Sequence, residues 1–500
     1  MQDASGADVR VAVIGSGLAG LATAHYLALA PIDKGKRVHV DIIEKNSSLG
    51  MDSESISIDQ EGEHVRIDVP MRSFSEGYYP ELIQLYRSLG IEFTRSKFSF
   101  AFSSFWPVEG NPPCEHGPNP EILYDGRSEG RGLSVYPEES SLRSRFRAAF
   151  CLLTIISSYI LLNILAILHS KRQNTTNYSS SLSQLTFKEW YEKTWISQWF
   201  LGEILCPLLS SVMTTNLKTI DSLPAAELLE YIARSFLSKH YTVKNGVQNV
   251  VRALVQCLAA EQIHLGATIS DLVPETDLHG THRISIRAEK QNGCTLDLPA
   301  YDHVIFATQC TQSSRLIQQY SAHLRDHQRQ DQLRCQAMIK QLSEMQYEKS
   351  TVVCHTDTKI LPKNPEWWRD LNFVSPKLVE KSSQYTMASH ILKRGQKDGT
   401  TFIQTTNPLS SLYPDPHTWI SNSTFERFIL TLRGDKARRH FFQRTSNQVK
   451  RSAGSKDHSV LSLGPLQGRP ASTPNDHQPY PGLWLTGSWS FGVPLLEGMS

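Results

Sequence analysis

The sequence predicts an α/β protein with two intertwined domains, one of which is built on a parallel sheet. A glycine-rich turn joins an apolar strand to a helix within the first 30 residues. A second apolar run then ends on a carboxylate, at Glu44. The chain also has 500 residues, which is more than a single hydrophobic core usually holds. These observations indicate a strand, helix and strand that begin a larger fold.

The first element is the strand and helix on either side of the glycine turn. Residues 11–14 form an apolar run typical of a buried parallel strand, and residues 18–29 read as the helix that follows. Gly15 suits the tight turn, Gly17 lets a diphosphate approach the backbone, and Gly20 lets the helix pack on the strand. The predicted cofactor-binding residues of this turn are Gly15, Ser16, Gly17, Leu18, Ala19 and Gly20.

The second element is the strand at residues 38–43, which is followed by Glu44. Glu44 comes 24 residues after Gly20, and a carboxylate at about this spacing accepts hydrogen bonds from ribose hydroxyls in dinucleotide sites. The N-terminus of the helix offers free N–H groups and a partial positive charge to the diphosphate. The sequence therefore predicts a Rossmann-type dinucleotide site.

The residues after Glu44 resemble a particular family of flavoproteins. The run from Glu44 and Lys45 to Gly50 and Met51 is similar to the flavin amine oxidoreductase and phytoene desaturase superfamily, in which this loop wraps the cofactor. That superfamily usually has a glycine pair where this chain has Gly50 and Met51. Residues 65–72 occupy the place where such enzymes run a strand and loop past the flavin ring.

The resemblance continues in the second half of the chain. Residues 263–269 read as a strand, and in the family the backbone of its last aliphatic residue, here Ile269, lies against the adenine. Residues 301–308 match the strand that returns to the nucleotide domain. Residues 482–499 match the closing strand and turn, which reach the flavin through residues that include Gly487, Gly498 and Met499. Because an NAD dehydrogenase has no need of this terminal element, FAD is favoured as the cofactor.

The resemblance implies a discontinuous Rossmann-type FAD-binding domain with an inserted α+β substrate domain of mixed sheet and helices. The FAD-binding domain is predicted at residues 1–75, 240–310 and 480–500, and the substrate domain at 76–239 and 311–479. Residues 435–481, which are basic and then rich in Ser, Pro and Asn, are predicted to be a mobile insertion. The motif His355-Thr-Asp357 narrows the resemblance to an amine-oxidase-like branch of predicted NAD/FAD-binding proteins.

Residues 148–168 form an apolar segment of 21 residues without a formal charge. As a helix the segment would be about 31 Å long, which is the thickness of a bilayer core. A single crossing would place the parts of the nucleotide domain on opposite sides of the membrane. Three placements stay open: docking in one leaflet, including a re-entrant hairpin, a buried helix and a true span. Trp190, Trp195 and Trp199 follow, either as an interfacial belt or as core residues.

The composition limits partners and compartment. The net charge of +2 is too balanced to indicate a nucleic-acid partner, and eight scattered cysteines without metal-ligand spacing predict neither disulfides nor a metal site. No secretory signal precedes the first strand. We expect a protein that lies on the cytoplasmic side and is not secreted. If residues 148–168 dock in a membrane, the protein is membrane-associated. Its expected partner is a small, hydrophobic substrate, and no protein partner is inferred.

The catalytic residues stay unassigned at this stage. His355 and Asp357 are either an acid–base pair on one strand face or residues that close a turn. Lys359 and Lys377 lie in the half of the chain where a lysine-held water would be expected, but no motif selects either. Three functions stay open: an FAD-dependent oxidase, dehydrogenase or desaturase of a lipophilic substrate, an amine oxidase for a soluble amine, and a non-catalytic or impaired flavin-binding protein.

Overall fold

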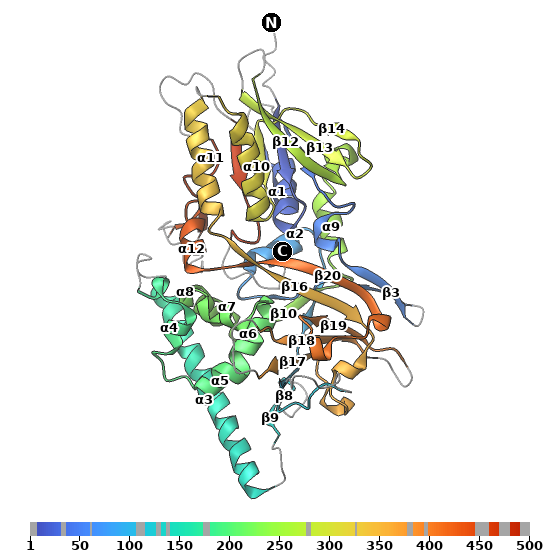
Figure 1. The fold of residues 1–500 in the computed structure, drawn as a ribbon, viewed down its shortest axis with the longest axis vertical. Helices are drawn as coiled ribbons and strands as arrows, with labels where there is room; N and C mark the ends of the chain where they lie inside the picture. Colours follow the sequence, from blue (N-terminus) through green and yellow to red (C-terminus); the bar gives the residue numbers. More distant parts are fainter. Residues whose placement is uncertain are drawn as a thin grey trace.

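The structure is a computed structural model of the 500-residue chain. It describes residues 8–31, 37–60, 63–106, 116–126, 132–136, 141–173, 181–276, 282–325, 328–377, 384–394, 399–445, 460–469 and 481–490. The described part has a nucleotide-binding half built on a parallel sheet and a second half built on a larger mixed sheet (Figure 1). The predicted α/β fold class is confirmed.

The parallel sheet is assembled from strands far apart in the sequence. Its order is β11 (Ile263–His264), β2 (Val38–Ile43), β1 (Val9–Ile14), β15 (His303–Phe306) and β23 (Gly482–Leu485), and all neighbours are parallel. Val11, Ala12, Val13 and Ile14 are buried, as expected for a parallel strand that is covered on both faces. The carboxyl ends of all five strands therefore meet at one edge.

Helices and a small antiparallel sheet surround the parallel sheet. Helix α1 (Leu18–Leu29) packs against β2 and α9 (Gln248–Val255). The antiparallel sheet contains β12 (Ala267–Thr276), β13 (His282–Lys290) and β14 (Thr295–Asp297). Helix α10 (Cys310–His323) packs on β12 and against α11 (Arg329–Leu342). These two helices therefore lie beside the parallel-sheet half (Figure 1), whereas the sequence analysis predicts residues 311–342 to be part of the substrate domain.

The mixed sheet forms the second half and has eight described strands. The pairing of β17 with β7 is parallel, and the other pairings are antiparallel. The order is β20 (Trp419–Ile429), β16 (Gln346–His355), β19 (Phe402–Thr406), β18 (Met387–Lys393), β17 (Leu371–Pro376), β7 (Phe100–Phe105), β8 (Ile122–Tyr124) and β9 (Leu133–Val135). The long strands β16 and β20 run side by side from α11 and α12 toward this sheet and so connect the two halves (Figure 1).

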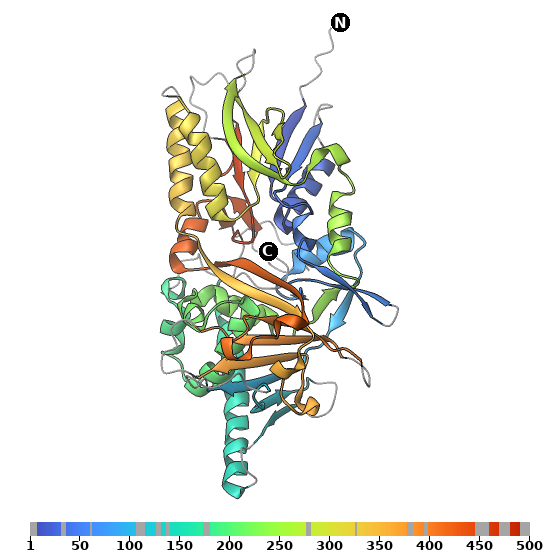
Figure 2. The ribbon, with the colours of Figure 1, turned by 45° about the vertical axis from the view of Figure 1, so that its right-hand side comes forward.

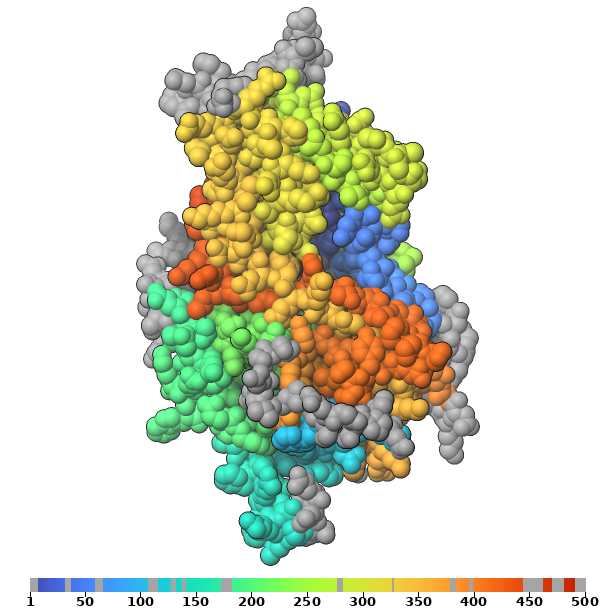
Figure 3. All heavy atoms as spheres, in the orientation of Figure 1, coloured from blue at the N-terminus to red at the C-terminus, as the bar shows by residue number. Residues whose placement is uncertain are grey.

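Helices cover one side of the second half, and α3 (Leu142–Gln173) extends beyond the rest of the molecule at its lower end (Figure 2). Helix α3 packs against α8 and α5, and the space-filling view shows its outer part as the lower tip (Figure 3). The remaining helices are α2 (Pro80–Ser88), α4 (Phe187–Tyr191), α5 (Gln198–Phe200), α6 (Cys206–Met213), α7 (Leu217–Ser222), α8 (Ala225–Ser235) and α12 (Leu432–Arg438), with a π-helical turn at Leu201–Leu205.

Three small sheets complete the described fold. They are β3 (Ile56–Gln60) with β4 (Glu63–Ile67), β5 (Phe74–Ser75) with β10 (His240–Val243) and β6 (Phe93–Ser96), and β21 (Phe442–Thr445) with β22 (Val460–Leu463).

Part of the predicted mobile insertion is packed instead. Residues 435–445 and 460–463 belong to the end of α12 and to the β21–β22 pair, and Phe441 is fully buried against Trp489. Arg438 is buried as well, with ion pairs to Asp435 and Glu227. These contacts hold this region on the body of the protein. Residues 446–459 and 470–480 of the predicted insertion lie outside the described residues.

Candidate dinucleotide site

The glycine turn after β1 is packed so closely that two of its positions exclude any side chain. Gly15 has a φ of +98°, and a Cβ atom there would lie 2.7 Å from the carbonyl oxygen of Ala307. A Cβ on Gly20 would lie 2.1 Å from the carbonyl oxygen of Gly15. The turn therefore brings the start of α1 directly onto the edge of the sheet, as the sequence predicted.

The N-terminus of α1 is open to an anion. Gly17 is its N-cap and provides no capping side chain, and the first turn of the helix contains no acidic residue. The first four N–H groups of a helix have no partner within the helix, and they favour negative charge. The predicted contacts to Leu18 and Ala19 lie in this first turn. This geometry fits the diphosphate of a dinucleotide.

Glu44 binds the turn itself. Its Oε2 atom accepts hydrogen bonds from the backbone N–H of Ser16 at 2.9 Å and from Ser16 Oγ at 2.6 Å. Its Oε1 atom accepts from the N–H of Asn46 at 2.9 Å. Ser16 Oγ also accepts from the N–H of Gly50 at 2.8 Å. The contact of Glu44 with a ribose stays a prediction. The structure shows in addition that the Glu44 carboxylate holds the glycine turn through its hydrogen bonds to Ser16.

The loop after Glu44 packs on the glycine turn through Gly50. A Cβ there would lie 2.9 Å from the carbonyl oxygen of Ser16, so this position also requires glycine. Met51, in the short 3₁₀ helix Gly50–Asp52, is 1% exposed, and its carbonyl accepts a hydrogen bond from Arg72 Nη2 at 2.9 Å. Lys45 is exposed at the surface. Of these three predicted site residues, Gly50 lies against the turn, and Met51 is the buried residue that follows it.

The predicted strand at 263–269 is two strands. Gly266, with a φ of +64°, turns the chain after Ile263–His264, and the next strand starts at Ala267. Only the first part pairs with β2 in the parallel sheet, whereas Ile269 pairs with Ala288 in the antiparallel sheet. The single-strand prediction was wrong because a left-handed glycine breaks the run. The chain still passes the site, since the N–H of Ala267 donates to the Glu44 carbonyl at 2.9 Å.

The strand at 301–308 and the closing strand lie where the sequence predicted. β15 lies between β1 and β23, so the last described segment of the chain reaches the same sheet edge as the glycine turn. Gly487 follows β23 with a φ of +153°, and a Cβ there would lie 2.8 Å from Trp489 Nε1. Gly498 and Met499 lie outside the described residues.

The loop that the resemblance places beside the flavin is held by a residue from the mixed sheet. Gln404 Oε1 accepts from the N–H of Met71 at 2.6 Å, and Gln404 Nε2 donates to the carbonyl of Asp68 at 3.0 Å. Asp68 Oδ1 accepts from the N–H of Val247 at 3.0 Å, and burial raises the pKa of the Asp68 carboxyl. Gln404 could not be identified from the sequence, because it lies more than 300 residues from its partners.

His355 closes a turn. Its Nδ1 atom accepts from the N–H of Asp357 at 3.1 Å, which leaves Nε2 to donate to Thr405 Oγ1 at 2.8 Å. Asp357 accepts from the N–H groups of Lys359 and Asp415. His355 is fully buried, and burial lowers its pKa to about 4, so the ring is neutral at pH 7. Of the two predicted alternatives, the turn is the one that these contacts support.

The two candidate lysines and the tryptophans are also placed. Lys359 is exposed, and Lys377 forms an ion pair with Glu203. Trp190 is buried and stacks on Phe187, whereas Trp195 is 96% exposed and Trp199 is 37% exposed. The core interpretation therefore holds for Trp190 alone among the three tryptophans. Nothing in these contacts gives either lysine a catalytic role.

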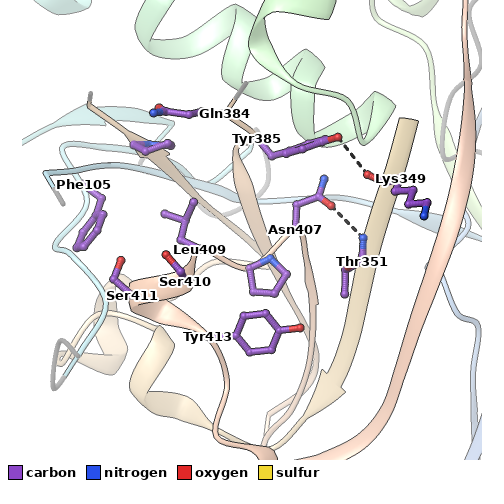
Figure 4. A pocket seen from close by; sticks show the side chains of 12 residues that line it. Phe105, Lys349, Thr351, Gln384, Tyr385, Asn407, Leu409, Ser410, Ser411 and Tyr413 are labelled. Carbon is purple, nitrogen blue, oxygen red and sulfur yellow. Dashed lines mark hydrogen bonds between the residues drawn. The ribbon is translucent and has the colours of Figure 1, made fainter. Parts of the chain in front are cut away.

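A cavity of about 410 Å³ lies on the mixed sheet (Figure 4). Tyr385 Oη donates to the Lys349 carbonyl at 3.1 Å, and Asn407 Oδ1 accepts from the N–H of Thr351 at 3.1 Å. Among the described residues of the lining, Lys349 is the one that carries a charge. This size is typical of sites for small organic molecules. The lining residues are Phe105, Lys349, Thr351, Pro376, Gln384, Tyr385, Asn407, Pro408, Leu409, Ser410, Ser411 and Tyr413.

Comparison with known proteins agrees with the Rossmann-type site. Residues 13–89 match the family model of the NAD(P)-binding Rossmann-like domain, so the predicted dinucleotide-binding unit is confirmed. A comparison with curated proteins gives no match.

A comparison with solved structures gives similar chains at low sequence identity. Cyclohexylamine oxidase from Brevibacterium oxydans is 11% identical with a TM-score of 0.48, over 87% of this chain and 91% of that one. An oxidoreductase from Methanosarcina mazei is 13% identical with a TM-score of 0.49, over 98% of each chain. A Rab GDI from Plasmodium falciparum is 12% identical with a TM-score of 0.41, over 84% of this chain and 89% of that one.

Proposed function

We propose that this protein is an FAD-dependent oxidoreductase that dehydrogenates or desaturates a lipophilic organic substrate. The observation that carries the proposal is the glycine turn at the carboxyl edge of a parallel sheet, with the open N-terminus of α1 beside it. Bound flavin would accept a hydride from a substrate carbon. The chain's own residues would bind the diphosphate at residues 15–20 and keep the turn rigid through Glu44 and Ser16.

FAD is supported over NAD by the closing part of the chain. β23 pairs with β15, and Gly487 follows it at the edge that carries the glycine turn. The resemblance assigns this segment to contacts with the flavin side of the cofactor. The loop at residues 68–72, which the resemblance places beside the ring, is tied to the mixed sheet by Gln404. Contacts from both segments would suit a cofactor such as FAD, which extends beyond its nucleotide unit.

The lipophilic character of the substrate is supported by helix α3. Nine large apolar or aromatic side chains on this helix are at least 45% exposed, and only 28% of its most apolar 18-residue stretch is buried. Eight of them recur every three or four residues, which places them on one helix face. They are Leu142, Phe146, Phe150, Leu153, Ile156, Ile160, Ile164 and Leu168, with Tyr159 beside them.

The arrangement of α3 favours docking in one leaflet. Ile155, Leu162 and Ala166 are buried on the opposite face of the helix, so α3 has one side on the protein and one continuous apolar side outside. An in-plane amphipathic helix has this character, whereas a spanning helix would need apolar contact all round. A fully buried helix is not what the structure shows. Arg143, Arg145 and Arg147 are exposed at its outer end, and they would favour anionic lipids.

Two other functions make different predictions. An amine oxidase would need carboxylates or aromatic rings to receive a cationic substrate, and the described lining of the cavity contains the rings of Phe105, Tyr385 and Tyr413 but no carboxylate. A non-catalytic flavoprotein would bind flavin without any change when substrate is added. Both alternatives can be separated from the proposal by the same experiment.

The experiment is an anaerobic titration of the purified protein, followed by its visible spectrum. We expect a yellow protein whose flavin absorbance bleaches with a lipid extract that contains neutral and acidic lipids and returns in air. Bleaching by amines alone would support the amine oxidase, and no bleaching by either class would support the non-catalytic protein. A colourless protein that cannot be reconstituted with FAD would contradict the proposal.

A further inference from the structure

Arg427 on β20 is half-buried as a whole, but part of its guanidinium group is buried without a partner among the described residues. Its Nε and Nη2 atoms are inaccessible to solvent, and neither has a hydrogen-bond partner in the described part of the chain. The guanidinium lies 4.8 Å from the centroid of the Phe425 ring, which is a cation–π contact and supplies no acceptor for these N–H groups. A buried charge is normally paired or hydrogen-bonded.

The strand geometry shows where this guanidinium points. Ser423, Phe425 and Arg427 alternate along β20 and so lie on one face of the strand. Ser423 Oγ donates to Glu54 Oε2 at 2.8 Å, and Phe425 packs against the cluster that contains Ile67 and Val69. Arg427 therefore lies on the face of β20 that packs on the segment leading from Glu54 to the loop at 68–72.

A second buried arginine lies at the end of that segment. Arg72 is 7% exposed, and its Nη2 atom donates to the carbonyl of Met51. The neighbouring Gly50 contacts the glycine turn through Ser16. Burial lowers the pKa of Arg427 to about 9, and the positive charge of Arg72 contributes to this shift. The two guanidinium groups therefore repel each other. Asp68 and Asp52 act on Arg72, whereas among the described residues no carboxylate acts on Arg427.

We propose that Arg427 and Arg72 form an oxyanion site beside the glycine turn, which takes a phosphate of the dinucleotide or the acid group of a lipophilic substrate. The planar guanidinium groups suit phosphate and carboxylate equally, because each can donate two parallel hydrogen bonds. The bound oxyanion would satisfy the Nε and Nη2 atoms of Arg427. The identity of the anion rests on the proposed function. The test of the site measures binding and does not require catalytic turnover.

The test compares the wild type with Arg427→Met, which keeps the length of the side chain and removes its charge. Removal of an unpaired buried charge should leave the melting temperature of the flavin-free protein unchanged or raised. Binding of the oxyanion should weaken by about 10-fold or more, since charge-assisted hydrogen bonds are lost. Arg433→Gln, at an exposed position on α12, is the control for the loss of one positive charge.

Three ligands identify the source of the anion. Weaker binding of FAD with unchanged binding of riboflavin, which lacks phosphate, assigns the site to the dinucleotide. Unchanged FAD binding, with a weaker effect of decanoate on the spectrum of the bound flavin, assigns it to the substrate. If the wild type binds no flavin, the proposed function fails. The site is then tested by the melting temperature in inorganic pyrophosphate, which should rise in the wild type and not in the variant.

The result that overturns the inference is equally clear. If Arg427→Met melts lower without flavin and binds every ligand as the wild type does, Arg427 serves packing alone. Where Arg427→Met does not fold, Arg427→Lys replaces it, since lysine keeps the charge and loses the two-pronged geometry. Wild-type affinity of Arg427→Lys for FAD and for decanoate would also overturn the proposed site.

Discussion

The exposed face of α3 gives a quantitative test of membrane docking. The change is Phe146→Gln, Phe150→Gln and Leu153→Gln together, at side chains that are 70%, 70% and 66% exposed. Full burial of one such side chain contributes about 2 kcal/mol. At these exposures the three side chains would contribute about 4 kcal/mol to insertion, which corresponds to about a 1,000-fold change in partitioning. Glutamine is used because it is a good helix former.

The assay is flotation of the purified protein with vesicles that contain anionic lipid. The wild type should float with the vesicles and the triple variant should stay at the bottom of the gradient, with both melting at the same temperature. A control variant, Tyr26→Gln with Leu29→Gln and Leu333→Gln, removes side chains that are 59%, 59% and 56% exposed on α1 and α11. The control should float like the wild type. Equal flotation of all three proteins would refute the docking of α3.

Three further predictions concern the dinucleotide site and the fold. Gly20→Ala places a Cβ 2.1 Å from the Gly15 carbonyl oxygen, so it should lower the free energy of unfolding by at least about 3 kcal/mol. Gly293→Ala, where no atom lies within 4 Å of the added Cβ, should lower the free energy of unfolding by only about 1 kcal/mol in denaturant titrations. Equal losses in the two variants would contradict the close packing at Gly20. Glu44→Gln should lose about 2 kcal/mol of charge-assisted hydrogen bonding to the turn. This variant should therefore have a lower melting temperature and weaker FAD binding than Ser16→Ala. A larger loss in Ser16→Ala would show that the Glu44 carboxylate is not the main group that holds the turn. Burial lowers the pKa of His355 from 6.5 to about 4, so the unfolded chain binds more protons between these values, and stability falls by about 3 kcal/mol as the pH drops from 6.5 to 4. His355→Gln should lose that part of the acid sensitivity in urea titrations at pH 4 and 7, and an unchanged pH dependence would show that His355 is not buried in the neutral form.

The dinucleotide site was largely predictable because its determinants are local. The turn depends on Gly15 and Gly20, whose packing partners follow from the strand and helix on either side. Glu44 ends the next strand, so its position near the turn follows from the parallel pairing of β1 with β2. What the sequence could not show is that the carboxylate accepts hydrogen bonds from Ser16, because this depends on the conformation of one side chain.

The remaining features depend on contacts between distant parts of the chain. Gly266 splits one apolar run into two strands, and the run itself has no marker for which half joins the parallel sheet. The neighbours of Gln404 at Asp68 and Met71 come from more than 300 residues away. Arg427 carries a weak signal, since it is a charge in a strand that also contains Phe425 and Phe428. Its partner Arg72 could not be identified without the fold.

The charges on the described surfaces favour one class of substrate, whereas the fold alone does not distinguish between the classes. Among the described residues, the lining of the cavity on the mixed sheet has one charged member, Lys349. The outer end of α3 carries three exposed arginines. A protonated amine would meet neutral or positive groups at these two places, and like charges in a low-dielectric site are strongly unfavourable. The same positive groups would attract an acidic lipophilic molecule and would not repel a neutral one. The proposed lipophilic substrate therefore agrees with the charges at these two places as well as with the apolar face of α3.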